Sequence, residues 1–229
     1  MHHEGNHHLA ANKTYISIHR YFDWPTARSD VRKFYTNCTF CELSKATRNI
    51  THKRSRAIES QPPRSRYGMD YYGVGDGEVL GLMDLDSTHV ELFWHEHRSA
   101  VKCHQSIRDG ILHRHGRFDE LRSDHAREFI GRIMTMLQQE LGFKATTTGG
   151  YHAKGNSKME RFWRYFGTAI RSLTDTQCTN AKYYIQSIAF VCNTTMSESL
   201  TVSPFEVHTG TRARTITDGF LTQRVSDGP

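Results

Sequence analysis

The residues most suited to bind a metal ion lie near the N-terminus. The segment HHEGNHH, residues 2–8, precedes the sequence CTFC that spans Cys38 to Cys41. A CxxC loop presents two thiolates to one tetrahedral ion, and two histidine nitrogens complete such a site. We take His3 and His8 as the first choice for these nitrogens, with His3 and His7 as the alternative. The sequence therefore predicts one structural Zn²⁺, held by His3, His8, Cys38 and Cys41.

A second group of candidate residues is acidic and lies in the rest of the chain. Asp124 and Glu160 enclose 35 residues, and Asp70 interrupts a strand pattern, where aspartate is disfavoured unless something compensates. Spacing alone does not identify a site, because two further pairs have the same separation: Asp23/Glu59 and Asp84/Glu120.

These carboxylates could hold metal ions in a catalytic site, or they could have ordinary structural roles. Asp124 could cap the helix that follows it, and Glu160 could form a surface ion pair with Arg164. If Asp70, Asp124 and Glu160 converge, their charges repel each other unless divalent cations neutralise them. Hard oxygen ligands suit Mg²⁺ or Mn²⁺, and two such ions about 4 Å apart support phosphoryl transfer.

Hydrophobic periodicity predicts the elements that position these residues. Two short helices are expected at 9–18 and 27–35, ahead of the candidate carboxylates. The remaining elements are strands at 67–74, 78–85 and 88–95, a helix at 101–111, a strand at 118–121, a helix at 129–141, a strand at 143–147, and helices at 162–173 and 184–191. This order predicts an α/β fold with a mixed sheet, because parallel strands need helical crossovers.

The chain divides where the periodic pattern disappears. Residues 1–48 form the predicted zinc-binding domain, 49–62 a basic linker that ends near Pro62-Pro63, 63–215 the main domain, and 216–229 a tail. The net charge of +6 favours a polyanionic partner. Five cysteines, an odd number, indicate a reducing compartment, and no apolar run is long enough to predict a membrane partner.

Several segments resemble the integrases of retroviruses and gypsy-type LTR retrotransposons. HHLAANKTY, YFDWP and DVRKFYTNCTFCELSK are similar to the HHCC zinc-binding domain of that family. In the main domain, the family pattern Ser-Asp-x-Gly-x-Glu-Phe is matched at Ser123, Asp124, Glu128 and Phe129, and its His-Pro-x-x-Asn-Gly-x-x-Glu-Arg pattern at His152, Asn156, Glu160 and Arg161. VSPFEVHTG resembles the element near the end of integrase catalytic cores.

The resemblance implies a ribonuclease-H-like mixed sheet with flanking helices, preceded by a small helical zinc-binding domain. It also implies that Asp70, Asp124 and Glu160 are the catalytic carboxylates that hold two Mg²⁺ or Mn²⁺ ions. The expected activity is that of a DDE-type polynucleotidyl transferase, which trims the ends of element DNA and joins them to target DNA. Double-stranded DNA is the expected partner, with assembly as a homo-oligomer on DNA, in the nucleus or in a cytoplasmic nucleoprotein particle.

Departures from the family pattern keep other functions open. Ala153 and Ser157 replace the family's proline and glycine. A decayed or repurposed copy that only binds nucleic acid is one alternative, and a cut-and-paste transposase of the same fold is another.

Polar residues around Glu160 are the expected contacts to a phosphate backbone. A solvated helix face is the competing interpretation. The predicted DNA-binding residues are Lys154, Asn156, Lys158, Arg161 and Arg164.

Overall fold

Two helices form the N-terminal part of the chain. The computed structural model describes residues 8–39, 41, 61–124, 131–147, 157–173, 180–196 and 202–219. Helix α2 (Ala11–His19) packs against helix α3 (Ala27–Thr36), and both agree closely with the predicted spans. The carboxylate of Asp30 fixes the start of α3, because it accepts hydrogen bonds from the Trp24 indole at 2.8 Å and the Thr26 hydroxyl at 2.6 Å.

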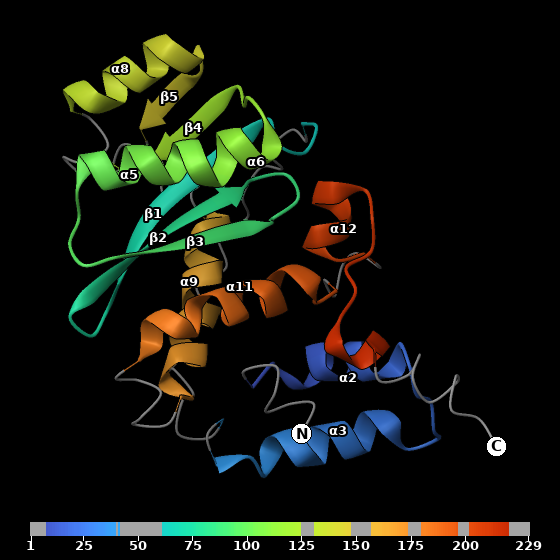
Figure 1. Ribbon diagram of the computed structural model, residues 1–229. Helices are drawn as coiled ribbons and strands as arrows, with labels where there is room; N and C mark the ends of the chain where they lie inside the picture. Colours follow the sequence, from blue (N-terminus) through green and yellow to red (C-terminus); the bar gives the residue numbers. More distant parts are fainter. Residues whose placement is uncertain are drawn as a thin grey trace.

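A five-stranded mixed sheet forms the main part of the molecule (Figure 1). Its strands are β1 (Arg66–Val74), β2 (Gly77–Asp84), β3 (Val90–His95), β4 (Glu120–Ser123) and β5 (Lys144–Thr147). Their order is β3-β2-β1-β4-β5; the pairs β1/β2 and β2/β3 are antiparallel, whereas β1/β4 and β4/β5 are parallel. The predicted mixed sheet is therefore confirmed.

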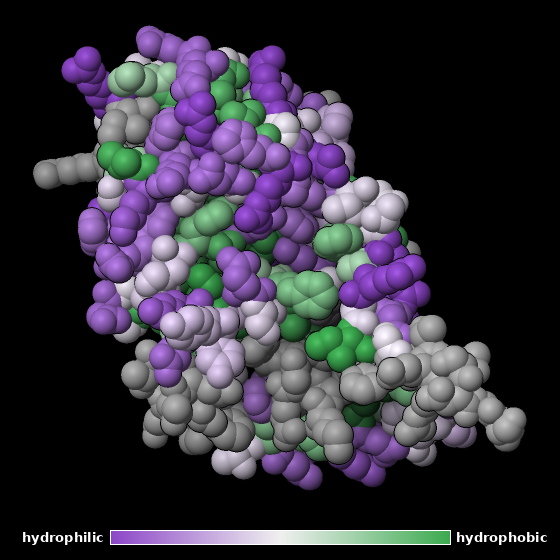
Figure 2. Space-filling model, viewed as in Figure 1, coloured by the Kyte–Doolittle hydropathy of each residue, from purple (hydrophilic) through white to green (hydrophobic). Residues whose placement is uncertain are grey.

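Helices cover both faces of this sheet. The first group comprises α5 (Ala100–Ile107), the π-helical turn η1 (Arg108–Leu112), α6 (His113–His115) and α8 (Arg132–Leu141). The second comprises α9 (Ser157–Arg171), the 3₁₀ turn η2 (Ala181–Tyr183), α11 (Ile185–Thr194) and α12 (Pro204–Thr209). In the view of Figure 2 the outer surface of α5 and α8 is mostly hydrophilic, as expected for amphipathic helices that cover a sheet.

The sheet separates two hydrophobic cores, and this decides which way Asp70 points. Tyr67, Met69 and Tyr71 of β1 pack in the core on the α5 side, whereas Val74 packs in the core that contains Trp163 of α9. Because side chains alternate along a strand, Asp70 lies on the α9 side.

Some boundaries differ from the sequence prediction for identifiable reasons. The helix predicted at 101–111 continues to His115 and contains a π-helical turn at Gly110, where an added Cβ would lie 2.1 Å from the Phe93 ring. Helix α12 was not predicted; a capping box fixes its start, with reciprocal hydrogen bonds between Ser203 and Glu206. Of the linker predicted at 49–62, only residues 61 and 62 lie within the described residues.

The N-terminal helices lie beside α11 and the segment that follows α12 (Figure 1). The Tyr21 hydroxyl is 3.2 Å from the hydroxyl of Thr215 and donates a hydrogen bond to Asp218 at 3.0 Å. The Lys13 ammonium lies over the Tyr165 ring, 5.6 Å from its centroid. Within the described ranges, no helix has both the length and the apolar character needed to cross a bilayer.

Candidate metal centres

Three of the four predicted zinc ligands come together at the ends of α2 and α3. His8 stands just before α2, and Cys38 and Cys41 follow α3. The Nδ1 atom of His8 is 3.2 Å from Sγ of Cys38 and 3.7 Å from Sγ of Cys41, and all three ligand atoms lie within 4.8 Å of one another. Ligands of a tetrahedral Zn²⁺ with ordinary Zn–N and Zn–S bonds are separated by roughly 3.5 Å, so this donor set fits the ion.

The predicted fourth zinc ligand falls outside the part of the chain that the structure describes. His3, the first choice, and His7, the alternative, both lie outside the described residues. The structure places His8 with the two cysteines, whereas the identity of the second histidine stays a prediction.

Two hydrogen bonds hold the carboxylate of Asp70 in place. The backbone N–H of Tyr71 donates to Oδ1 at 2.8 Å, and the indole Nε1–H of Trp163 donates to Oδ2 at 3.0 Å. Burial raises the pKa of Asp70 above its usual value, and the charge of Asp124 raises it further, although the two hydrogen bonds and Arg98 act in the opposite direction. A divalent cation would favour the ionised form of this carboxyl group.

Asp124 lies near Asp70 because their strands are parallel neighbours. The register pairs Gly68 of β1 with Arg122 of β4, and Asp124 follows directly after β4. The Asp124 side chain is exposed, and its charge acts on Asp70. This is the carboxyl end of a parallel strand, where open α/β sheets commonly place ligands.

Glu160 is an exposed residue in the first turn of α9. It precedes Trp163 by three positions, so the two side chains are neighbours one helical turn apart, with Glu160 exposed and Trp163 buried. The hydrogen bond from Trp163 to Asp70 brings this end of α9 next to β1. Among the described residues, however, the ligand atoms of the zinc group lie within 4.8 Å of one another, whereas those of the three carboxylates are farther apart.

The two carboxylates of Asp84 and Glu120, which have the same spacing, form hydrogen bonds and an ion pair with other residues. Asp84 is fully buried and accepts hydrogen bonds from the Ser87 hydroxyl at 2.5 Å and from the backbone N–H of Arg64 at 3.0 Å; His208 Nδ1 is also 3.0 Å away. Burial alone would raise the pKa of Asp84, but these bonds lower it to about 2. Glu120 pairs with Arg122 at 2.9 Å. Both carboxylates therefore have structural roles.

The third equally spaced pair is not a site in the described part of the chain. Asp23 is an exposed side chain near the end of α2, and its imidazole partner is His19 at 3.3 Å. Glu59 lies outside the described residues.

Trp163 and Gly81 shape the surroundings of Asp70, and the sequence analysis predicted neither role. Gly81 pairs with Asp70 across the β1/β2 ladder, and a Cβ at position 81 would lie 2.7 Å from the Trp163 ring. The absence of a side chain at Gly81 lets the indole reach the carboxylate. An isolated glycine inside a strand pattern often marks such a close approach, so Gly81 in EVLGLMD, residues 78–84, was a usable signal.

The predicted DNA contacts are only partly described. Arg161 and Arg164 are exposed on α9, whereas the Lys158 ammonium donates a hydrogen bond to the backbone carbonyl of Leu85. Lys154 and Asn156 lie outside the described residues. Contact of these residues with DNA stays a prediction.

Comparisons with known proteins agree with these features. Residues 1–47 match a family model described as the integrase zinc binding domain. The structure is similar to a chain in the cryoEM structure of the simian T-cell lymphotropic virus intasome in complex with PP2A regulatory subunit B56 gamma. The TM-score is 0.57 with 11% sequence identity, and the match covers 88% of this chain and 70% of that chain.

At this identity the structural match establishes the fold alone, and the fold is the ribonuclease-H-like one expected. The family match to residues 1–47 adds an integrase-type zinc-binding domain. The resemblance to integrases is thereby confirmed, whereas the narrower assignment to the gypsy-type group stays a prediction.

Proposed function

We propose that this chain is a retroelement integrase that processes the ends of element DNA and joins them to target DNA. The integrase zinc-binding match and the fold shared with an intasome chain support integrase function in general. One observation carries the catalytic part of the proposal: Asp124 directly follows β4, the parallel neighbour of the strand that holds Asp70, and the hydrogen bond from Trp163 brings the helix with Glu160 to Asp70.

Each carboxylate has its own part in the proposed site. Asp70, Asp124 and Glu160 would hold two Mg²⁺ or Mn²⁺ ions, which supply Lewis-acid stabilisation of the charge that develops during phosphoryl transfer. Asp70 is oriented by its two hydrogen bonds, whereas Asp124 and Glu160 are exposed and reachable from solvent.

The proposed reaction has two steps at phosphorus. In the first, a water oxygen attacks a phosphodiester near the end of the element DNA, the P–O3′ bond breaks, and a 3′-hydroxyl is released on the element strand. In the second, that hydroxyl oxygen attacks a phosphodiester of the target, forming one P–O bond while the target's P–O3′ bond breaks. The number of phosphodiester bonds is unchanged in the second step, so no external energy source is required.

The other parts of the chain have supporting roles in this proposal. Residues 1–48 form the zinc-binding domain, 49–62 the linker, 63–215 the catalytic core and 216–229 a tail. Arg161 and Arg164 are exposed beside Glu160 on α9 and would contact DNA phosphates, as would Lys154, Asn156 and Lys158. We expect assembly as a homo-oligomer on double-stranded DNA, in the nucleus or a cytoplasmic nucleoprotein particle.

A strand-transfer assay tests the proposal directly. A labelled duplex with the element's terminal sequence is incubated with the zinc-loaded protein, Mn²⁺ and a second duplex. Asp70→Asn should abolish both processing and joining while leaving DNA binding measurable. Asp119→Asn is the matched control, because the Asp119 side chain is 74% exposed and lies just before β4. Joining by Asp70→Asn at the wild-type rate would refute the assignment.

The same assay separates the alternatives. A decayed copy would bind the duplex without cutting or joining it. A cut-and-paste transposase would cut both strands at the element end, whereas an integrase would leave the non-transferred strand of its substrate intact.

A further inference from the structure

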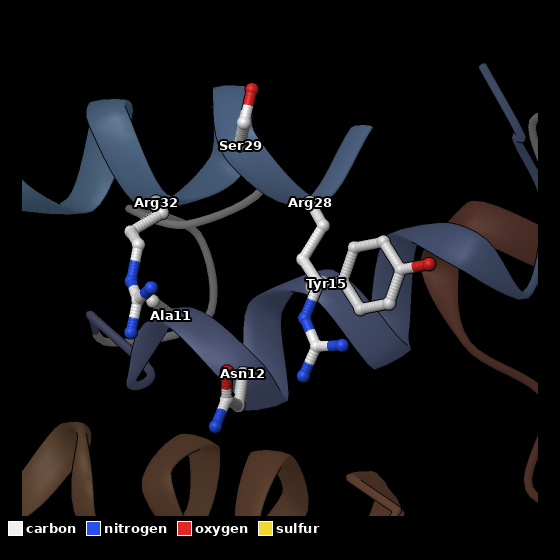
Figure 3. Close-up of a pocket in the computed structure, with 6 residues that line it drawn as sticks. All are labelled: Ala11, Asn12, Tyr15, Arg28, Ser29 and Arg32. Atoms are coloured by element: carbon white, nitrogen blue, oxygen red, sulfur yellow. The ribbon is translucent and has the colours of Figure 1, made fainter. Parts of the chain in front are cut away.

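A pocket between the two N-terminal helices has no role in the proposed catalytic site. Its cavity volume is about 380 Å³, within the usual range for small-ligand sites. The described residues that line it come from both helices: Ala11, Asn12 and Tyr15 of α2, and Arg28, Ser29 and Arg32 of α3 (Figure 3).

Two arginines give this pocket its positive charge. Arg28 and Arg32 are four positions apart on α3, and both side chains extend from α3 toward α2 (Figure 3). Among the described residues neither guanidinium forms an ion pair. Asp30, the acidic residue between them, accepts hydrogen bonds from Trp24 and Thr26 instead. Like charges at this spacing destabilise a helix slightly, so a bound anion would relieve their repulsion.

The charge of the surrounding segment has the same sign. Residues 8–39 contain five Lys or Arg residues and two Asp residues. Both guanidinium groups are exposed, so an anion from solvent can reach them without any rearrangement of the fold.

Aromatic packing orients one of the two guanidinium groups. Arg28 lies over the Tyr15 ring, 5.8 Å from its centroid, and the Tyr15 ring stacks on His19 at 5.1 Å. Asn12 adds an amide to the lining of the pocket, whereas the Ser29 hydroxyl points away from both arginines (Figure 3). Two guanidinium forks and one amide are therefore the groups available to a ligand.

We propose that this α2–α3 pocket binds a phosphate group. The planar donor fork of arginine matches phosphate oxygens, and two such forks offset the charge of a phosphate dianion or of two adjacent phosphodiesters. The cavity is larger than one phosphate, so the group belongs to a nucleic-acid backbone or to a free polyphosphate. The proposal depends on the zinc-binding domain alone, and its failure would leave the carboxylate site and the proposed reaction untouched.

Binding of tripolyphosphate to the full, zinc-loaded chain tests this inference by isothermal titration calorimetry. We expect one site per chain, and at least a tenfold weaker affinity for Arg28→Gln and for Arg32→Gln, since each variant loses charge-assisted hydrogen bonds. Lys33→Gln is the control: it removes the same charge from an exposed position on α3 that does not line the pocket, and should change affinity less than twofold. Zinc content and circular dichroism verify that each variant is folded.

Two results would overturn the proposal. One is the absence of saturable binding by the wild-type protein, and the other is an equal loss of affinity in Lys33→Gln, which would show attraction by net charge alone. Competition then identifies the source of the phosphate. A duplex oligonucleotide that displaces tripolyphosphate assigns the pocket to a nucleic-acid backbone, and simultaneous binding of both assigns it to a free polyphosphate.

Discussion

His89 makes the stability of the main domain depend on pH. Its ring is 6% exposed and stacks on the His208 ring, with centroids 4.3 Å apart, while His115 approaches edge-on at 6.0 Å. Burial is the main cause that lowers the pKa of His89 from 6.5 to about 4; His208 and His115 lower it as well, while Glu91 and Asp84 act in the opposite direction.

The sign and size of the effect follow from linkage. The unfolded chain takes up a proton at this histidine near pH 6.5, whereas the folded protein does so only near pH 4, so acid favours the unfolded state. The stability that His89 contributes is present above about pH 6.5 and is lost as the pH falls toward 4. At about 1.4 kcal/mol per pH unit, the full loss is about 3 kcal/mol, of which about 2 kcal/mol is lost by pH 5.

Replacing His89 with phenylalanine isolates this contribution. His89→Phe keeps an aromatic ring beside His208 and Phe205 and removes the titrating group. The free energy of unfolding is measured by urea denaturation at pH 7.5 and pH 5.0 with saturating Zn²⁺, for the wild type and the variant. Changes in zinc binding and in other groups affect both proteins and cancel in the comparison.

We expect the wild type to lose about 2 kcal/mol more than His89→Phe between the two pH values. His97→Asn, a change at an exposed histidine, should follow the wild type. If His89→Phe and the wild type lose stability in parallel, His89 is not a buried neutral histidine and the reasoning fails.

Three further predictions concern the metal centres. Trp163→Phe removes the indole N–H from Asp70 and should weaken Mn²⁺ binding about tenfold, measured by electron paramagnetic resonance of free Mn²⁺; unchanged affinity would contradict the positioning role. Gly81→Ala places a methyl group 2.7 Å from the Trp163 ring and should cost about 1–3 kcal/mol of stability in urea denaturation, whereas an unchanged midpoint would show that the indole moves aside freely. Removal of zinc by a chelator, or Cys41→Ser, should unfold α2 and α3 and lower the helical circular dichroism signal; a full signal in metal-free protein would argue against a structural ion.

Much of the fold followed from local sequence patterns. The five strands and most helices were predicted with small errors at their ends, because hydrophobic periodicity depends on residues a few positions apart. Helix α12 escaped prediction because it is six residues long, too short for a periodic pattern, and its capping box at Ser203 and Glu206 determines its start.

The ligand types of the zinc site were also set by sequence. Cys38 and Cys41 sit three positions apart, so one turn after α3 presents both sulfur atoms to the same point. Local sequence does not fix which histidine lies beside these sulfur atoms, because that depends on how the two helices pack. The structure places His8 there.

Only the tertiary structure showed which partners the carboxylates have. Asp84 is tied to His208, 124 positions away in the sequence, and Asp70 is bonded to Trp163, 93 positions away. The sequence by itself determined which residues can serve as metal ligands and which elements carry them. Burial and hydrogen bonding between distant segments gave Asp84 a structural role and left Asp70 beside Asp124. The reason is that the partners of a carboxylate depend on how the chain packs and not on its local sequence.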